Sequence, residues 1–150
     1  MHFFNNIGYA INLFHTAMAF KLKILSLNAR GIRNPNKRRS SNVLLFKTAK
    51  SSIFCLRERY SQPDDEKIWS AEWGGKILFC HGTARSKGVC ILLNQNSSFN
   101  FDVVQSDHQD RILISKLKIF EETFFIVNIY APTDYRKQIN YRGWLELYTS

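Results

Sequence analysis

Short apolar runs alternate with polar loops along most of the chain. Leu22 to Leu27 is typical of a buried strand, and the following loop, Asn28 to Asn36, is rich in Asn, Gly and Pro, which end strands. A helix is predicted next, and a second apolar run, Ile53 to Leu56, is predicted as a strand. This order predicts a βαβ unit with two parallel strands. The candidate caps of the helix are Ser40, Ser41 and Asn42.

A series of strands is predicted in the second half of the chain. Its short, polar connections fit a meander in which neighbouring strands pair antiparallel. An acidic loop, Gln62 to Glu66, precedes the series, and Asp134 can cap a final helix from about Tyr135 to Leu147. The predicted strands are Lys76 to Cys80, Gly88 to Leu93, Phe99 to Gln105, Ile112 to Ile119 and Thr123 to Tyr130.

The composition is that of one globular domain, and the order of the predicted strands and helix indicates the α/β class. The 150 residues are 45% hydrophobic and 22% charged, which is enough apolar side chain for one core. The three cysteines, Cys55, Cys80 and Cys90, show no C-x-x-C spacing, so neither a zinc ribbon nor a disulfide scaffold is indicated.

The first twenty residues carry no charged side chain. We expect residues 1–20 to be an apolar leader outside the domain, which then spans residues 21–150. The segment resembles a signal peptide that lacks the basic start, so secretion is the alternative to an intracellular location in the nucleus or cytoplasm. No later stretch is apolar enough to span a membrane, and we expect no membrane partner.

The positive charge of the chain is concentrated in one segment. The net charge is +9, and residues 21–50 hold nine Lys and Arg with no acid, whereas residues 51–150 are balanced. Such a segment favours a polyanionic partner, because neutralising phosphates releases counterions; a solvated helix face is the alternative. The candidate nucleic-acid-binding residues are Arg30, Arg33, Lys37, Arg38 and Arg39.

Three predicted strands each deliver a polar residue at or directly beyond the end of an apolar run: Asn28, Glu58 and Tyr130. Binding groups gather at such strand ends in parallel and mixed sheets. Each also has a structural explanation: Asn28 can shape a turn, Glu58 can pair with Arg57 or Arg59, and Tyr130 can be an edge aromatic.

Three segments in order resemble the endonuclease/exonuclease/phosphatase superfamily, which has the deoxyribonuclease I-like fold. The resemblance is closest to the endonuclease domain of LINE-type retrotransposons. The first segment resembles the family's opening strand and L-N-x-x-G-L motif, the second its L-Q-E-T-H motif and the third its N-x-Y-x-P motif. These segments are Leu25 to Arg33, Leu56 to Tyr60, and Asn128 to Pro132.

The resemblance implies a Mg²⁺- or Mn²⁺-dependent phosphodiester hydrolase acting on DNA. It implies that Glu58 is the metal carboxylate, that Asn28 orients the metal shell or the attacking water, and that Tyr130 stabilises the phosphate. The basic segment would then contact the DNA backbone. The implied fold is a truncated four-layer α/β/β/α sandwich, with a mixed sheet and flanking helices.

The chain also departs from the family. Arg57 and Arg59 flank Glu58 where Gln and Thr are common, and the family's second half, which supplies the general base, has no counterpart. We therefore expect the N-terminal portion of a nuclease domain, inactive on its own, with a sheet face exposed where the second half would pack. A non-catalytic nucleic-acid-binding remnant and the phosphatase branch of the superfamily are the alternatives.

Overall fold

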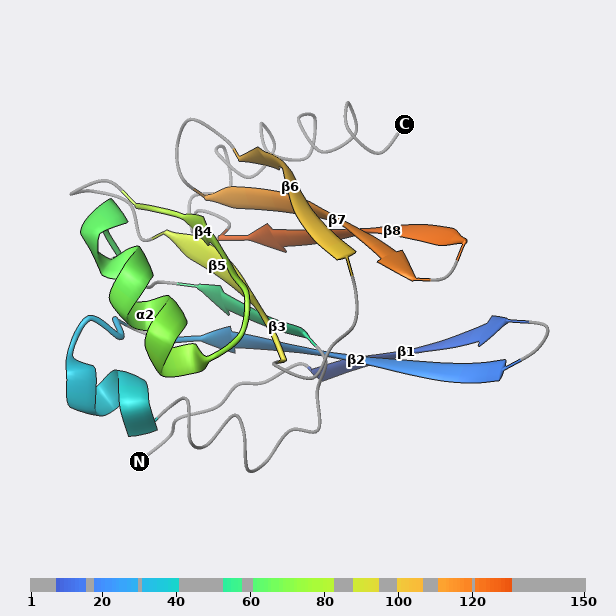
Figure 1. Cartoon of the computed structure of the whole chain (residues 1–150), viewed down its shortest axis with the longest axis horizontal. Helices are drawn as coiled ribbons and strands as arrows, with labels where there is room; N and C mark the ends of the chain where they lie inside the picture. The colour runs from blue at the N-terminus through green and yellow to red at the C-terminus, as the bar shows by residue number, and fades with distance from the viewer. Residues whose placement is uncertain are drawn as a thin grey trace, which may run out of the picture.

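Two sheets face each other in the structure, which is a computed structural model. It describes residues 8–15, 18–29, 31–40, 53–57, 61–82, 88–94, 100–106, 111–119 and 121–130. The first sheet has the strand order β1-β2-β3-β5-β4 and the second β6-β7-β8 (Figure 1). The strands are β1 (Gly8–His15), β2 (Met18–Asn28), β3 (Ile53–Arg57), β4 (Ile77–Cys80), β5 (Val89–Leu93), β6 (Asn100–Ser106), β7 (Ile112–Ile119) and β8 (Glu122–Ile129).

The strand pairings confirm the predicted α/β class and the predicted parallel pair. β2 and β3 run parallel, with Leu27 opposite Leu56, and β5 then pairs antiparallel with both β3 and β4, so the first sheet is mixed. The predicted meander is correct for β6, β7 and β8, which pair as consecutive antiparallel neighbours. It is wrong between β5 and β6, because the chain leaves the first sheet there and enters the second.

The main core lies between the two sheets. Val89 and Ile91 of β5 belong to the same buried cluster as Leu113 and Leu117 of β7, and all four are fully buried. The described strands thus supply both sheets around this core, and the exposed face expected where a second half would pack stays a prediction. One large apolar side chain on the second sheet, Phe125, is 60% exposed and lies outside this core.

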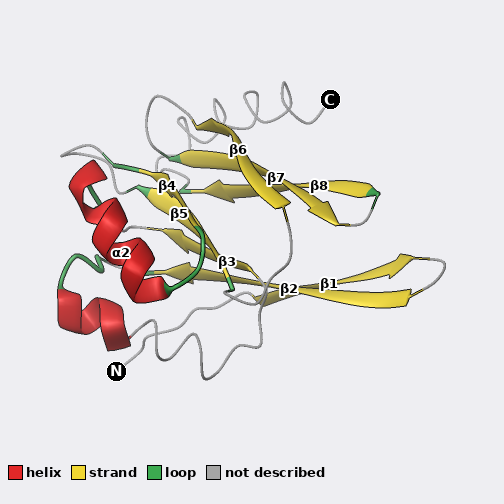
Figure 2. Cartoon of the chain, viewed as in Figure 1, coloured by secondary structure: helices red, strands yellow, loops and turns green. Residues whose placement is uncertain are grey.

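A helical layer covers the other face of the first sheet (Figure 2). It contains a short 3₁₀ turn, η1 (Pro63–Asp65), and helix α2 (Glu66–Trp73), where the sequence indicated only a loop before β4. Trp69 and Trp73 are four residues apart, so both point to the same side of α2 and are buried against the sheet. Trp73 also donates a 2.6 Å hydrogen bond from Nε1 to the carbonyl of Leu93. Gly74 ends the helix at φ 73°, a left-handed conformation that favours glycine.

A second helix in this layer begins earlier than the sequence indicated. Residues 35–40 are helical, and Asn34 caps them: its Oδ1 accepts hydrogen bonds from the backbone N–H of Asn36 at 2.9 Å and Lys37 at 3.2 Å. Pro35 follows at the first helical position, where its missing N–H costs nothing. The predicted cap at Ser40 to Asn42 is therefore too late, and the later part of that predicted helix lies outside the described residues.

The apolar N-terminal segment contributes a strand. β1 pairs antiparallel with β2 over its whole length, from Gly8 opposite Leu25 to His15 opposite Met18. The segment predicted as an apolar leader outside the domain therefore joins the first sheet, because an extended backbone can hydrogen-bond to the edge of an existing sheet. The predicted final helix, Tyr135 to Leu147, lies outside the described residues. Among the described helices, none is long and apolar enough to cross a bilayer.

Candidate functional site

The carboxyl ends of the parallel strands β2 and β3 lie side by side at one end of the first sheet. Asn28 lies opposite Arg57 in the parallel ladder, and the N–H of Ala29 continues it with a 2.9 Å hydrogen bond to the carbonyl of Arg57. Asn28 is exposed at this end. Glu58, the next residue after Arg57 in the sequence, lies outside the described residues. The predicted site therefore begins at a strand end, where binding groups gather in parallel and mixed sheets.

Asn128 joins the second sheet to the first at this same end of the strands. Its side chain is buried, and Nδ2 donates to the carbonyl of Leu56 on β3 at 3.0 Å and to the carbonyl of Cys90 on β5 at 2.7 Å. Tyr130 follows two residues later; its N–H donates to the carbonyl of Arg111 at 2.8 Å, and its ring packs against the core between the sheets. Asn28 and Tyr130 are thus brought to the same end of the molecule.

Sequence reasoning gave Asn128 no role of its own. The signal available was an amide inside the otherwise apolar run from Thr123 to Tyr130, where an unsatisfied polar group would be costly. The structure satisfies both amide protons on the facing sheet, so Asn128 positions the end of β8 next to the end of β3.

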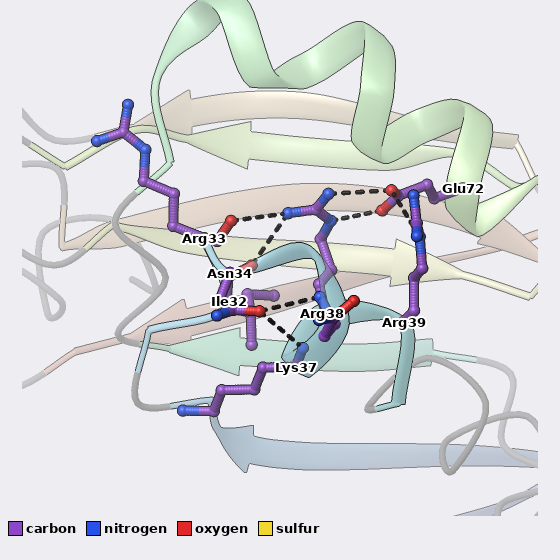
Figure 3. A network of polar contacts seen from close by, with 8 residues as sticks. Ile32, Arg33, Asn34, Lys37, Arg38, Arg39 and Glu72 are labelled. Carbon is purple, nitrogen blue, oxygen red and sulfur yellow. Dashed lines mark hydrogen bonds and ion pairs between the residues drawn. The ribbon is translucent and has the colours of Figure 1, made fainter.

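The cations of the basic segment separate into two classes. Arg33, Lys37 and Arg39 are exposed, whereas Arg38 is only 4% exposed. The Arg38 guanidinium binds Glu72 of α2 through Nε at 2.5 Å and Nη2 at 3.0 Å (Figure 3). The expectation that Arg38 contacts nucleic acid is therefore wrong, because its donors face the protein interior. Arg30 lies outside the described residues.

The Arg38–Glu72 pair connects the two helices of the outer layer. Arg38 also donates from Nη1 to the carbonyls of Ile32 and Arg33 at 3.2 and 3.1 Å, and its guanidinium lies 5.0 Å from the centre of the Trp69 ring. These contacts use the planar fork of arginine, which a lysine does not have. The hydrogen bond from Arg38 is the main cause that lowers the pKa of Glu72, which keeps this carboxylate ionised.

A second polar network lies beyond the ends of β3 and β4. His81 receives contacts on both ring nitrogens: Nδ1 is 2.9 Å from the hydroxyl of Ser61, and Nε2 is 2.7 Å from a carboxylate oxygen of Glu66. In the tautomer that donates from Nε2 to Glu66, Nδ1 of His81 accepts a hydrogen bond from the Ser61 hydroxyl. The imidazole stacks on Phe79 with ring centres 5.3 Å apart. The network ties the chain after β3 to the end of β4, and the sequence analysis did not anticipate it.

Of the two residues predicted for the metal site, Asn28 is described by the structure and Glu58 is not. Asn28 offers an amide oxygen, and Mg²⁺ prefers such oxygens and keeps several of its waters. In the described part of the chain, no three His, Cys, Asp or Glu side chains are grouped to hold a metal ion. Burial raises the pKa of the Cys55 thiol to about 12, so this side chain stays protonated and does not offer a thiolate to a softer metal at neutral pH.

Comparison with known proteins relates the chain to a mobile element. No protein-family model matches it. It is 34% identical over 115 residues to the Transposon TX1 uncharacterized 149 kDa protein of Xenopus laevis. The matched region covers 75% of this chain and 8% of that protein, so the chain spans a small part of its relative's length. The similarity to a transposon-encoded protein supports a retrotransposon origin.

Proposed function

We propose that this chain is the N-terminal portion of a Mg²⁺-dependent phosphodiester hydrolase of the endonuclease/exonuclease/phosphatase superfamily, derived from a retrotransposon and acting on DNA. The observation that carries the proposal is the arrangement of one end of the two sheets. There, Asn28 lies opposite Arg57, and Asn128 holds the strand that leads to Tyr130 against β3. Similarity to a transposon-encoded protein supports the retrotransposon origin.

Each proposed role follows from the chemistry of a side chain. Glu58, directly after Arg57, would hold the cation, which when bound offsets negative charge on the phosphate and on the leaving oxygen. The Asn28 amide would orient a water molecule at the edge of the first sheet. The Tyr130 hydroxyl would donate a hydrogen bond to a phosphate oxygen as charge develops on it.

The isolated chain is expected to show no nicking of supercoiled plasmid above background with Mg²⁺ or Mn²⁺. The proposed roles include no general base, and such a group typically contributes about 10²- to 10⁴-fold. Fusing the second half of a related nuclease domain after Ser150 should restore nicking. Gel electrophoresis of the plasmid forms measures both reactions.

Restored nicking should then depend on the proposed site. Glu58→Ala should abolish it, and Tyr130→Phe should lower it by about 10²-fold or more, because one donor to the developing charge is removed. Glu122→Gln is the matched control: it removes an exposed carboxylate at the start of β8, the end of that strand remote from Tyr130. Glu58-dependent nicking by the unfused chain would show that the missing half is dispensable.

The exposed cations favour a second candidate function, a non-catalytic nucleic-acid-binding remnant. If Arg33 and Lys37 each neutralise a phosphate, replacing both by Ala should lower the magnitude of the log-log salt slope of duplex DNA binding by about 0.9 for each phosphate that is no longer neutralised. Fluorescence anisotropy between low and physiological salt measures this slope.

The control for the salt slope is the double substitution of Lys116 and Lys118 by Ala. Both lysines are exposed on β7, so the control removes the same charge from another surface. If both double variants lower the salt slope equally, the basic segment contributes no more to DNA binding than positive charge elsewhere on the surface. Metal-independent binding together with failure of the fused protein to nick would favour the remnant over the hydrolase.

A further inference from the structure

Arg57 directs its side chain into the space between the two sheets. Side chains alternate along β3: Ile53 and Cys55 belong to the core between the sheets, whereas Phe54 and Leu56 belong to the cluster under the helices. The same period of two places Arg57 on the side of Cys55. The positive charge of Arg57 opposes the rise in the pKa of Cys55, which agrees with this placement. Arg57 therefore places a charged side chain on the otherwise apolar inner face of β3, at the end of the strand where the candidate site lies.

The buried part of this arginine is not fully used by the protein. Nε of Arg57 is buried and has no hydrogen-bond partner in the part of the chain that the structure describes. Two of the described carboxylates are engaged elsewhere: Glu72 binds Arg38 and Arg39, and Glu66 binds His81. A buried donor without an acceptor destabilises the folded state. A ligand that supplies the acceptor would therefore gain binding free energy from this hydrogen bond.

Arg111 and Tyr130 lie at the same end of the facing sheet. The contact of Cys80 Sγ with the carbonyl of Ile112, at 3.7 Å, places the start of β7 against the end of β4. The hydrogen bond between the Tyr130 N–H and the Arg111 carbonyl places these two residues side by side. Arg111 lies two positions before the buried Leu113, so alternation also directs it toward the space between the sheets.

We propose that Arg57, together with Arg111, forms a subsite that binds a phosphodiester group of a nucleic-acid backbone at this end of the two sheets. An arginine fork matches two phosphate oxygens, and a second arginine from the opposite side encloses the group. The choice of nucleic acid as ligand rests on the proposed function, whereas binding at this subsite requires neither metal nor hydrolysis. The subsite would hold the phosphate next to Tyr130, so it would position the group that the proposed reaction cleaves.

The test measures binding of a fluorescein-labelled ten-nucleotide thymidine oligonucleotide to the full chain in EDTA, by fluorescence anisotropy. Arg57→Gln should weaken binding by about tenfold or more, since it removes charge-assisted hydrogen bonds to phosphate. Arg57→Lys should recover part of the affinity, because it restores the charge without the fork. Lys116→Gln, the control for removal of one exposed charge, should change affinity by about threefold or less.

A second measurement separates binding from structural support. Arg57→Gln should leave the free energy of unfolding unchanged or raise it, because the buried donor lacks a partner. Equal oligonucleotide affinity of the wild type and Arg57→Gln overturns the proposal, as does a decrease in affinity that equals the decrease caused by Lys116→Gln. A methylphosphonate oligonucleotide, which lacks backbone charge, should bind both proteins equally weakly, and a preserved dependence on Arg57 with this probe also overturns it.

These outcomes are independent of the proposed hydrolysis. Arg57-dependent binding in EDTA, combined with a fused protein that does not nick, would support the subsite and contradict the hydrolase. Nicking that depends on Glu58 but not on Arg57, with no effect of Arg57→Gln on oligonucleotide affinity, would support the hydrolase and contradict the subsite.

Discussion

Glu72→Ala is expected to lower the free energy of unfolding by about 3 kcal/mol or more, because it leaves the Arg38 guanidinium buried without its carboxylate. The Arg38 side chain is 5% exposed and the Glu72 side chain 17%, so solvent compensates only a small part of the change. The pair also joins the helix at residues 35–40 to α2, two elements of the layer that covers the first sheet. Urea unfolding followed by tryptophan fluorescence measures the change.

Arg39→Ala is the matched control for this prediction. Arg39 contacts the same carboxylate at 3.5 Å, but its side chain is 65% exposed, so its removal should cost about 1 kcal/mol or less. Equal decreases in stability for Glu72→Ala and Arg39→Ala would show that the buried pair contributes no more than a surface ion pair. This comparison tests how burial changes the contribution of an ion pair to stability, because both arginines carry the same charge and share one partner.

The same pair gives the stability a dependence on pH. The Arg38 hydrogen bond lowers the pKa of Glu72 from its ordinary value of 4.5, so the ionised carboxylate is favoured in the folded state. The stabilisation is complete above the pKa of the carboxyl in the unfolded chain, and is lost as the pH falls through the lower folded pKa. In Glu72→Gln the decrease of stability between neutral and acid pH should therefore be smaller than in the wild type.

Asn128→Asp should lower the free energy of unfolding by about 3 kcal/mol or more. The substitution nearly preserves the shape of the side chain but replaces a group that donates to two carbonyls with one that cannot donate when ionised. The aspartate would either be buried with its charge facing the carbonyls of Leu56 and Cys90 or have to take up a proton. Denaturant unfolding at neutral pH measures the destabilisation, which should decrease as the pH is lowered and the carboxyl protonates.

Ser115→Ala provides the comparison for Asn128. Ser115 is fully buried on β7 and its hydroxyl donates to the carbonyl of Ile126 at 3.2 Å, within the second sheet. Removing this hydroxyl should cost about 1 kcal/mol, the usual net value of one hydrogen bond. If the two variants were equally stable, the bonds that Asn128 makes across the sheets would contribute no more than a bond within one sheet.

The strands could be predicted from sequence because their local patterns are strong. The prediction of Ile112 to Ile119 matches β7 at both ends, and β8 differs from its prediction by one residue at each end. Helix α2 was missed because its eight residues are too few to show a clear helical periodicity. Trp69 and Trp73 stabilise this helix by packing against the first sheet, a contact that the local sequence does not reveal.

The candidate site was predictable in part. Strand order places Asn28 at the end of β2, and the position of Tyr130 after a strong strand was evident from sequence. Nothing local distinguishes Arg38 from Arg39, because the carboxylate that separates their roles is more than thirty positions away in the sequence. The direction of Arg57 likewise depends on a second sheet facing the first, which the sequence analysis did not expect.

The strand β1 limits where the N-terminus of the chain can be truncated without exposing β2. β3 pairs with β2 only from Ile24 to Asn28, so the earlier part of β2 has β1 as its partner and extends with it as a two-stranded ribbon (Figure 1). A truncation that begins at residue 21 would remove β1 together with the first residues of β2. The remaining part of β2 would become the edge of the sheet, with backbone donors and acceptors open to pairing with another chain. Because β1 is itself the edge strand, its removal would move this edge of the sheet from β1 to β2.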